Sequence, residues 1–181
     1  MYYPYYGNAS LYNYGYQPAY WAYPNNVAYD NRPNSFYYVN NGNNNPQLKD
    51  YGPKPFVVNI EEATKQNNNY RTALWTGSNL QVTVMSLNVG EDIGLEMHPH
   101  VDQFLRIEQG NGVTQMGPSK DNLNFQRNVN ENFAIMVPAG TWHNVTNTGD
   151  IPLKLYTIYA PPNHPFGTVH VTKADAMAAG D

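Results

Sequence analysis

Two stretches of the chain contain side chains of the types that can bind metal ions. The first, "GLEMHPHVDQFLRIEQG" at residues 94–110, contains two glutamates, two histidines, an aspartate and two glutamines. The second, "VPAGTWHNVTN" at residues 137–147, contains one histidine, His143. Imidazole and carboxylate groups suit Zn, Mn, Fe or Ni, and nothing in the sequence chooses among these ions. Glu96 and His98 are two residues apart, so on a strand they share one face.

The second stretch also predicts a tight turn before its histidine. Pro138, Gly140, His143 and Asn147 follow the spacing P-x-G-x-x-H-x-x-x-N. This spacing resembles the second motif of the cupin superfamily. The family pattern has a glycine six residues before the proline, where this chain has Asn132. Asparagine tolerates the left-handed conformation that such a glycine adopts, so we expect the turn to be kept.

The first stretch fits the first cupin motif, G-x5-H-x-H-x3/4-E-x6-G, in one register. Counting from Gly90 gives G-x5-E-x-H-x4-Q-x6-G, which ends at Gly110. In this register Glu96 replaces the first family histidine and His98 is the second. Gln103 replaces the family glutamate. Placing the two histidines of "HPH" on the motif instead breaks the spacing on both sides.

The resemblance, which covers roughly residues 55–171, implies a divalent metal site with four ligands: Glu96, His98, Gln103 and His143. It places His100 in a turn, outside the ligand set. Glu96 is also the candidate catalytic residue, because it could leave the metal and act as a base. The alternative is a metal-free barrel in which the buried histidines and the glutamine hydrogen-bond to one another.

Short apolar runs bounded by turn residues predict the elements that would position these groups. A helix is expected after Asn59 and another from Thr172 to Gly180, where Thr172 and Asp175 form a capping box. The runs between the helices predict strands: "YRTALWT", "LQVTVMSLNV", "QFLRIEQG", "GVTQMG", "LNFQRNV", "FAIMVP", "WHNVTN" and "PLKLYTIYAPP". Many short strands indicate an all-β sandwich or barrel, and the resemblance specifies a double-stranded β-helix, or jelly-roll, cupin barrel.

Several further residues lie near the expected mouth of the barrel. The loop "APPNHPFGTVH" carries His164, Phe166 and His170 and could fold back over it. Tyr156 and Tyr159 have opposite parity on one strand, so at most one faces the pocket. Asp102 is expected to point away from its neighbour, the proposed glutamine ligand.

The first 48 residues differ in composition from residues 49–181, which we expect to form the cupin domain. Residues 1–50 contain 12 of the 16 tyrosines and 11 asparagines, with frequent proline and glycine. A segment with so few aliphatic side chains cannot offset its ordering entropy, so we expect disorder at residues 1–48. Tyr/Asn-rich tracts also tend to self-associate. In composition the tail resembles those of bacterial spore coat proteins.

Composition excludes several classes of protein. The chain has no cysteine, which rules out disulfides, thiolate metal sites and a cysteine nucleophile. The net charge is −4 and Lys plus Arg number only 10, which disfavours a nucleic-acid partner. No apolar run is long enough for a membrane span, and the start of the chain does not resemble a secretory signal. We therefore expect a cytoplasmic protein without nucleic-acid or membrane partners.

Two functions are compatible with these features. The first is a metal-dependent enzyme of the isomerase or dioxygenase type, acting on a small polar or carbonyl substrate. The motifs resemble single-domain cupins described as mannose-6-phosphate isomerase-like, yet no phosphate-binding cluster is apparent among the basic residues: Arg106, Lys120, Arg127 and Lys154. The alternative is a structural protein, such as a spore coat component, that assembles through the tail. Open sheet edges also predict a homodimer, with residues 55–60 reaching the partner.

Overall fold

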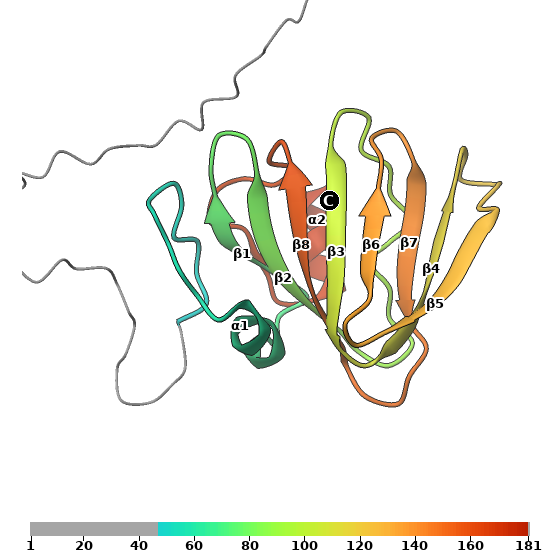
Figure 1. The fold of residues 1–181 in the computed structure, drawn as a ribbon, viewed down its shortest axis with the longest axis horizontal. Coiled ribbons are helices and arrows are strands. Elements are labelled where there is room, and N and C mark those ends of the chain that lie inside the picture. Colours follow the sequence, from blue (N-terminus) through green and yellow to red (C-terminus); the bar gives the residue numbers. More distant parts are fainter. Residues whose placement is uncertain (1–46, 181) are drawn as a thin grey trace, which may run out of the picture. The chain divides into compact units, whose positions relative to one another are not determined.

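The structure is a computed structural model that describes residues 47–180 (Figure 1). The predicted tail at residues 1–48 lies outside these residues except for its last two. The described part contains, in chain order, α1 (Ile60–Gln66), β1 (Arg71–Thr76), β2 (Gln81–Leu87), β3 (Asp102–Gln109), β4 (Asn111–Gly117), β5 (Phe125–Asn130), β6 (Ala134–Val137), β7 (Trp142–Asn147), β8 (Leu153–Ala160), β9 (Val169–His170) and α2 (Lys173–Ala179). The eight longer strands match the predicted apolar runs.

The strands form two antiparallel sheets. One has six strands in the order β6-β3-β8-β2-β1-β9, and the other has three in the order β5-β4-β7. Figure 1 shows the smaller sheet continuing around from the larger one, so that their inner faces enclose the core. The predicted all-β jelly-roll barrel with two short helices is therefore confirmed.

Register divides the inner face of the larger sheet into an apolar and a polar part. One row across the central strands is Met85, Leu155 and Ile107, which belong to the main core cluster together with Val129 and Val145 of the smaller sheet. The two rows beyond it are mostly polar and almost fully buried: Thr83, Thr157 and Leu105, then Gln81, Tyr159 and Gln103. The polar rows lie at the end of the barrel that carries the proposed ligands.

The outer face of the larger sheet is covered on one side by residues 48–66. Alternation along β1 and β2 would predict one buried and one exposed face, but nearly all of their residues are buried. The reason is a second apolar cluster, in which Phe56 and Val58 pack over Leu74 and Val84. The segment 55–60 thus packs on its own chain through Phe56, Val58 and Ile60, while the alternate residues are exposed, Val57 at 83%. A cavity of about 380 Å³ lies within this cover, on the opposite face from the proposed ligands.

Both helices have the predicted caps. Asn59 caps α1 by accepting a hydrogen bond from the backbone N–H of Glu62 at 3.3 Å. Thr172 and Asp175 form the capping box of α2, and Gly180 ends that helix with a left-handed φ of 84°. These caps satisfy backbone groups that short helices otherwise leave unpaired.

Candidate metal centre

The proposed ligands come from three separate parts of the chain. Glu96 and His98 lie on a segment that runs antiparallel to β7, with Glu96 and His143 exchanging backbone hydrogen bonds of 3.1 and 2.9 Å. The carbonyl of His98 accepts a further bond from Gly140 at 2.8 Å. This segment is not the regular strand that was predicted, since only an isolated bridge forms. The backbone bonds to β7 nevertheless turn both side chains inward.

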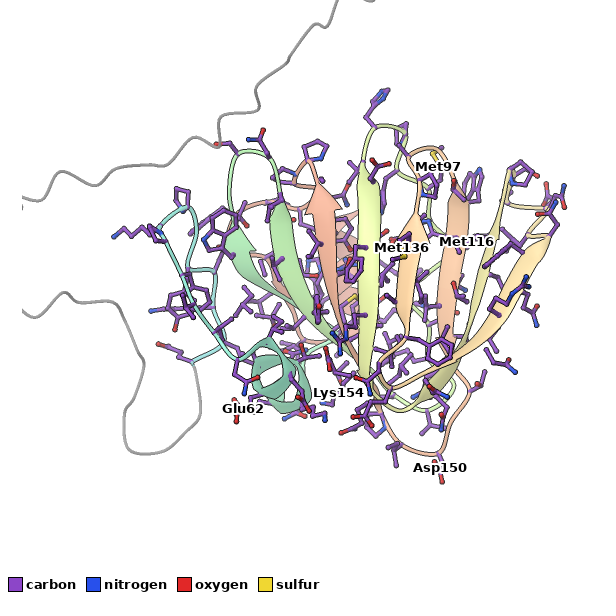
Figure 2. All side chains as sticks on the ribbon, in the orientation of Figure 1. Glu62, Met97, Met116, Met136, Asp150 and Lys154 are labelled. Carbon is purple, nitrogen blue, oxygen red and sulfur yellow. The ribbon has the colours of Figure 1, made fainter. Side chains whose placement is uncertain are left out.

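The side chains converge at one point between the sheets. Glu96 Oε1 lies 3.3 Å from both His98 Nε2 and His143 Nε2, and these three ligand atoms lie within 4.8 Å of one another. Gln103, from β3 on the opposite sheet, places Oε1 2.7 Å from His143 Nε2. Met97, which separates Glu96 from His98, marks this end of the barrel in Figure 2. All four predicted ligands are thus brought together.

The hydrogen bonds of His143 orient its ring toward this point. Nδ1 lies 3.0 Å from the carbonyl oxygen of Thr141. A carbonyl can only accept, so Nδ1 carries the proton and a neutral ring then presents the lone pair of Nε2. That lone pair faces the oxygens of Gln103 and Glu96. In this arrangement a cation among the three acceptor atoms is stabilising: a metal ion or, in the metal-free protein, a proton on Nε2.

The ligand atoms also lack other partners. Glu96 Oε1 and His98 Nε2 are buried and make no hydrogen bond within residues 47–180. Gln103 is held by a 3.2 Å hydrogen bond from its Nε2 to Thr157 Oγ1, which leaves Oε1 toward the cluster. A metal-binding histidine commonly donates its other ring N–H to a carbonyl, as His143 does to Thr141. The donor set of two imidazoles, a carboxylate and an amide therefore fits a divalent ion.

Electrostatics keep Glu96 ionised. In the metal-free protein, burial raises the pKa of Glu96, but proton sharing with the imidazoles of His143 and His98 and the positive charge of Arg71 outweigh it and lower that pKa to about 2. A carboxylate with so low a pKa is a good metal ligand and a weak base at neutral pH. The electrostatic contribution of Arg71, which is buried at the start of β1, was not apparent from the sequence.

The positions of Tyr159, Tyr156 and His164 bear on the predictions made from the sequence. Tyr159 is buried on the inner face, with its ring edge-on to His98 at a centroid distance of 5.7 Å, whereas Tyr156 belongs to the outer cluster. His164 packs against Tyr159 at 4.9 Å, and its backbone N–H and carbonyl both bond to the side chain of Gln81 at 2.9 Å. The loop carrying His164 therefore does fold back over this end of the barrel.

The remaining candidates lie away from the cluster. His100 is exposed and outside the ligand group, as expected. Asp102 is also exposed and accepts a 2.9 Å hydrogen bond from the backbone N–H of Ala139. Phe166 is 63% exposed, and His170 pairs with Arg71 in the sheet. Thr141 and Thr157, which orient two of the ligands, were not singled out, because neither residue type nor spacing shows which groups they contact.

Comparison with known proteins agrees with this geometry. The sequence profile of the family described as "Cupin domain" matches residues 83–159, which contain all four predicted ligands. A solved structure, BH2720 from Bacillus halodurans, is 67% identical to this chain with a TM-score of 0.72, and covers 72% of this chain and 99% of its own. Residues 83–159 therefore form a cupin domain.

Two other similar proteins support the same assignment of the fold and extend the likeness to the tail. YrkC of Bacillus subtilis, described as uncharacterized, is 65% identical over 180 residues, which is 98% of this chain and 94% of YrkC. A double-stranded β-helix protein from Klebsiella pneumoniae is 18% identical with a TM-score of 0.51, covering 65% of this chain and 98% of its own; it shares the fold alone. Within residues 47–180, neither helix of this cupin has the length and apolarity to cross a membrane.

Proposed function

We propose that this cupin is a metal-dependent enzyme acting on a small polar or carbonyl substrate, of the isomerase or dioxygenase type. The observation that supports it is the arrangement at His143: its Nδ1 proton is directed to Thr141, and its Nε2 lone pair meets two oxygens that need a shared cation. A Zn, Mn, Fe or Ni ion would satisfy all of these groups at once.

The side chains have separate roles in this proposal. His98 and His143 bind the ion, and Gln103 adds a neutral oxygen ligand that is fixed by Thr157. The bound ion supplies Lewis-acid character, which polarises a substrate oxygen. Glu96 balances the charge of the ion and is the candidate catalytic carboxylate, because it is the carboxylate of the ligand group. Tyr159 and the loop that carries His164 exclude water from this end of the barrel.

Metal content measured on the whole chain tests this proposal. Protein purified without a histidine tag should contain one divalent ion per chain by elemental analysis. His98→Ala and His143→Ala should each lose that ion, because each removes a ligand, while His100→Ala should keep it as a matched control. Wild-type protein that takes up no Zn, Mn, Fe or Ni, even when dialysed against each, would contradict the metal-centre proposal.

A second function is supported by the tail. Its Tyr/Asn-rich composition is typical of self-associating segments, and the alignment with YrkC extends over 180 residues and therefore through the tail. We infer that the tail promotes assembly, as in a spore coat layer. The full chain should then sediment as large species at high concentration, while a chain beginning at Lys49 stays small. Identical sedimentation of the two would remove the support for assembly.

A further inference from the structure

The inner face of the smaller sheet extends from the metal centre to an exposed edge. Register places His143 of β7 beside Met116 of β4, and Met116 beside Phe125 of β5. Residues directly opposite each other in antiparallel strands point to the same face. Phe125 therefore shares the face of His143, two strands away, which is about 10 Å. Met116, labelled in Figure 2, is partly buried between them.

Arg127 stands over Phe125 on this face. Arg127 and Phe125 have the same parity as Val129, which is buried in the core cluster, so all three point inward. The guanidinium carbon of Arg127 lies 4.5 Å from the centroid of the Phe125 ring. Both side chains are exposed, with Phe125 at 40%, although they belong to the concave side of the barrel. Together they form what we call the Arg127–Phe125 platform.

The charge on Arg127 has no counter-ion within the chain segment that the structure describes. Its one hydrogen bond there runs from Nη1 to the carbonyl of Gln126 at 2.7 Å. By contrast, Arg106 lies 3.3 Å from the carboxylate of Glu108, and Lys65 lies 2.6 Å from that of Glu61. The planar guanidinium keeps donors available for an incoming anion, and it binds a carboxylate with two parallel bonds.

We propose that the Arg127–Phe125 platform binds the substrate, and that the substrate is a small organic carboxylate with an apolar or planar portion. Arg127 pairs with the carboxylate, while Phe125 and Met116 contact the apolar portion beside the metal centre. A single arginine matches one carboxylate better than a phosphate ester, which usually requires a cluster of cations. This inference deepens the proposed function, because it assigns a substrate class to the same site.

Binding of benzoate, compared with its neutral isostere benzamide, tests the platform. Calorimetry on metal-loaded and on metal-free wild-type protein should show benzoate binding at least about fivefold more tightly than benzamide, as expected for one partly exposed ion pair. Arg127→Gln should abolish this preference, and Phe125→Ala should weaken both ligands. Lys120→Gln removes a cation from the turn of the same hairpin and should behave as wild type. Both platform variants should keep the metal content of wild type, since neither residue is a ligand.

Several results would overturn this assignment. Equal affinities for benzoate and benzamide would exclude ion pairing at the platform. So would a Lys120→Gln variant that loses the preference for benzoate as completely as Arg127→Gln. Tighter binding of inorganic phosphate than of benzoate would exclude the carboxylate class. Because binding is also measured on metal-free protein, the two proposals are tested separately. A chain that takes up no metal contradicts the proposed function, and benzoate binding to the metal-free protein still tests the platform.

Discussion

The two ring nitrogens of His143 are distinguished by the partner of each. One faces a carbonyl and the other faces Gln103 and Glu96, so the orientation of the ring is fixed before any ligand arrives. Gln103 is the one neutral oxygen ligand, in the place where the family pattern has glutamate. A neutral amide can lie 2.7 Å from His143 without adding a second charge beside Glu96. The substitution therefore lowers the repulsion within the metal-free cluster.

Gln103→Glu is predicted to lower the stability of the metal-free protein and to raise its affinity for metal. A second carboxylate beside Glu96 repels it when no cation is present, so the metal-free protein should unfold at a lower temperature. With metal bound the added charge should tighten binding by about tenfold. Thermal unfolding with and without metal measures both effects, because a tighter ligand raises the melting temperature further. An unchanged metal-induced shift would contradict Gln103 as a ligand.

Asn132 is predicted to be replaceable by glycine but not by alanine. Its φ of 70° is left-handed, as expected for the position where the family pattern has glycine. Asn132→Ala should lower the free energy of unfolding by about 1 kcal/mol, because a Cβ is strained in this conformation. Asn132→Gly should be near neutral, losing only the 2.9 Å bond to Arg106. Chemical denaturation measures both variants. If they lower the free energy of unfolding equally, the lost bond to Arg106, and not backbone strain, determines the effect.

The segment that carries Glu96 is held in place by the C-terminal helix. Asp92, four residues before Glu96, accepts a 2.7 Å bond from Gly94 N and pairs with Lys173 at the start of α2. The backbone of Ile93 also bonds to Val145 of β7 at 3.1 Å. The C-terminal helix and β7, both distant from this segment in the sequence, thus fix the path of the ligand segment.

Lys173→Met is predicted to destabilise the domain at neutral pH but not at low pH. Burial raises the pKa of Asp92, but Lys173 and Gly94 outweigh it, so the folded value lies below the ordinary 3.8. A lowered pKa contributes stability above that ordinary value and loses it as the pH falls through the folded value. At pH 7 the loss should be about 0.5–1 kcal/mol, since the pair is partly exposed. The difference from wild type should disappear once the pH has fallen below the folded pKa of Asp92.

Chemical denaturation across this pH range measures the effect. Lys65→Met, which breaks an exposed pair with Glu61 on α1, is the matched control and should cost less at neutral pH. If Lys173→Met lowers the free energy of unfolding by the same amount at acid pH, the effect comes from packing of the lysine side chain and not from its charge.

On the scale of the whole molecule, the metal centre joins the two sheets. Gln103 belongs to the six-stranded sheet and His143 to the three-stranded sheet, with Glu96 and His98 on the segment beside the latter. The polar rows of the inner face give few apolar contacts at this end, in contrast to the core cluster at the other. A bound ion would therefore hold together the end of the barrel that the core stabilises least.

Removal of the metal is predicted to loosen that end selectively. Amide hydrogen exchange should quicken in residues 94–98 and in β7 when a chelator is added, because local opening there no longer breaks metal bonds. The central strands, β8 and β2, should change little, since their bonds lie within the large sheet. His143→Ala should show the fast pattern with or without chelator. Uniform acceleration across all strands would contradict a local role.

The sequence by itself determined the local features of this protein. Apolar runs between turn residues predicted the strands, and Asn59 and Thr172 predicted the helix caps, because these depend on neighbouring residues only. The register of the ligands from Gly90 followed from spacing and the family resemblance. Alternation between buried and exposed residues is absent from β1 and β2, since the preceding segment, residues 48–66, covers their outer face.

Only the tertiary structure decided how the site is completed. The contacts of Gln103 with Thr157, the nearby charge of Arg71 and the alignment of Phe125 with His143 all depend on which strands are neighbours and in what register. Strand register is set by packing between segments that are distant in sequence, so residue types along the chain do not reveal it. The sequence therefore predicted a set of ligands, while the fold supplied the groups that orient these side chains and the surface that leads to them.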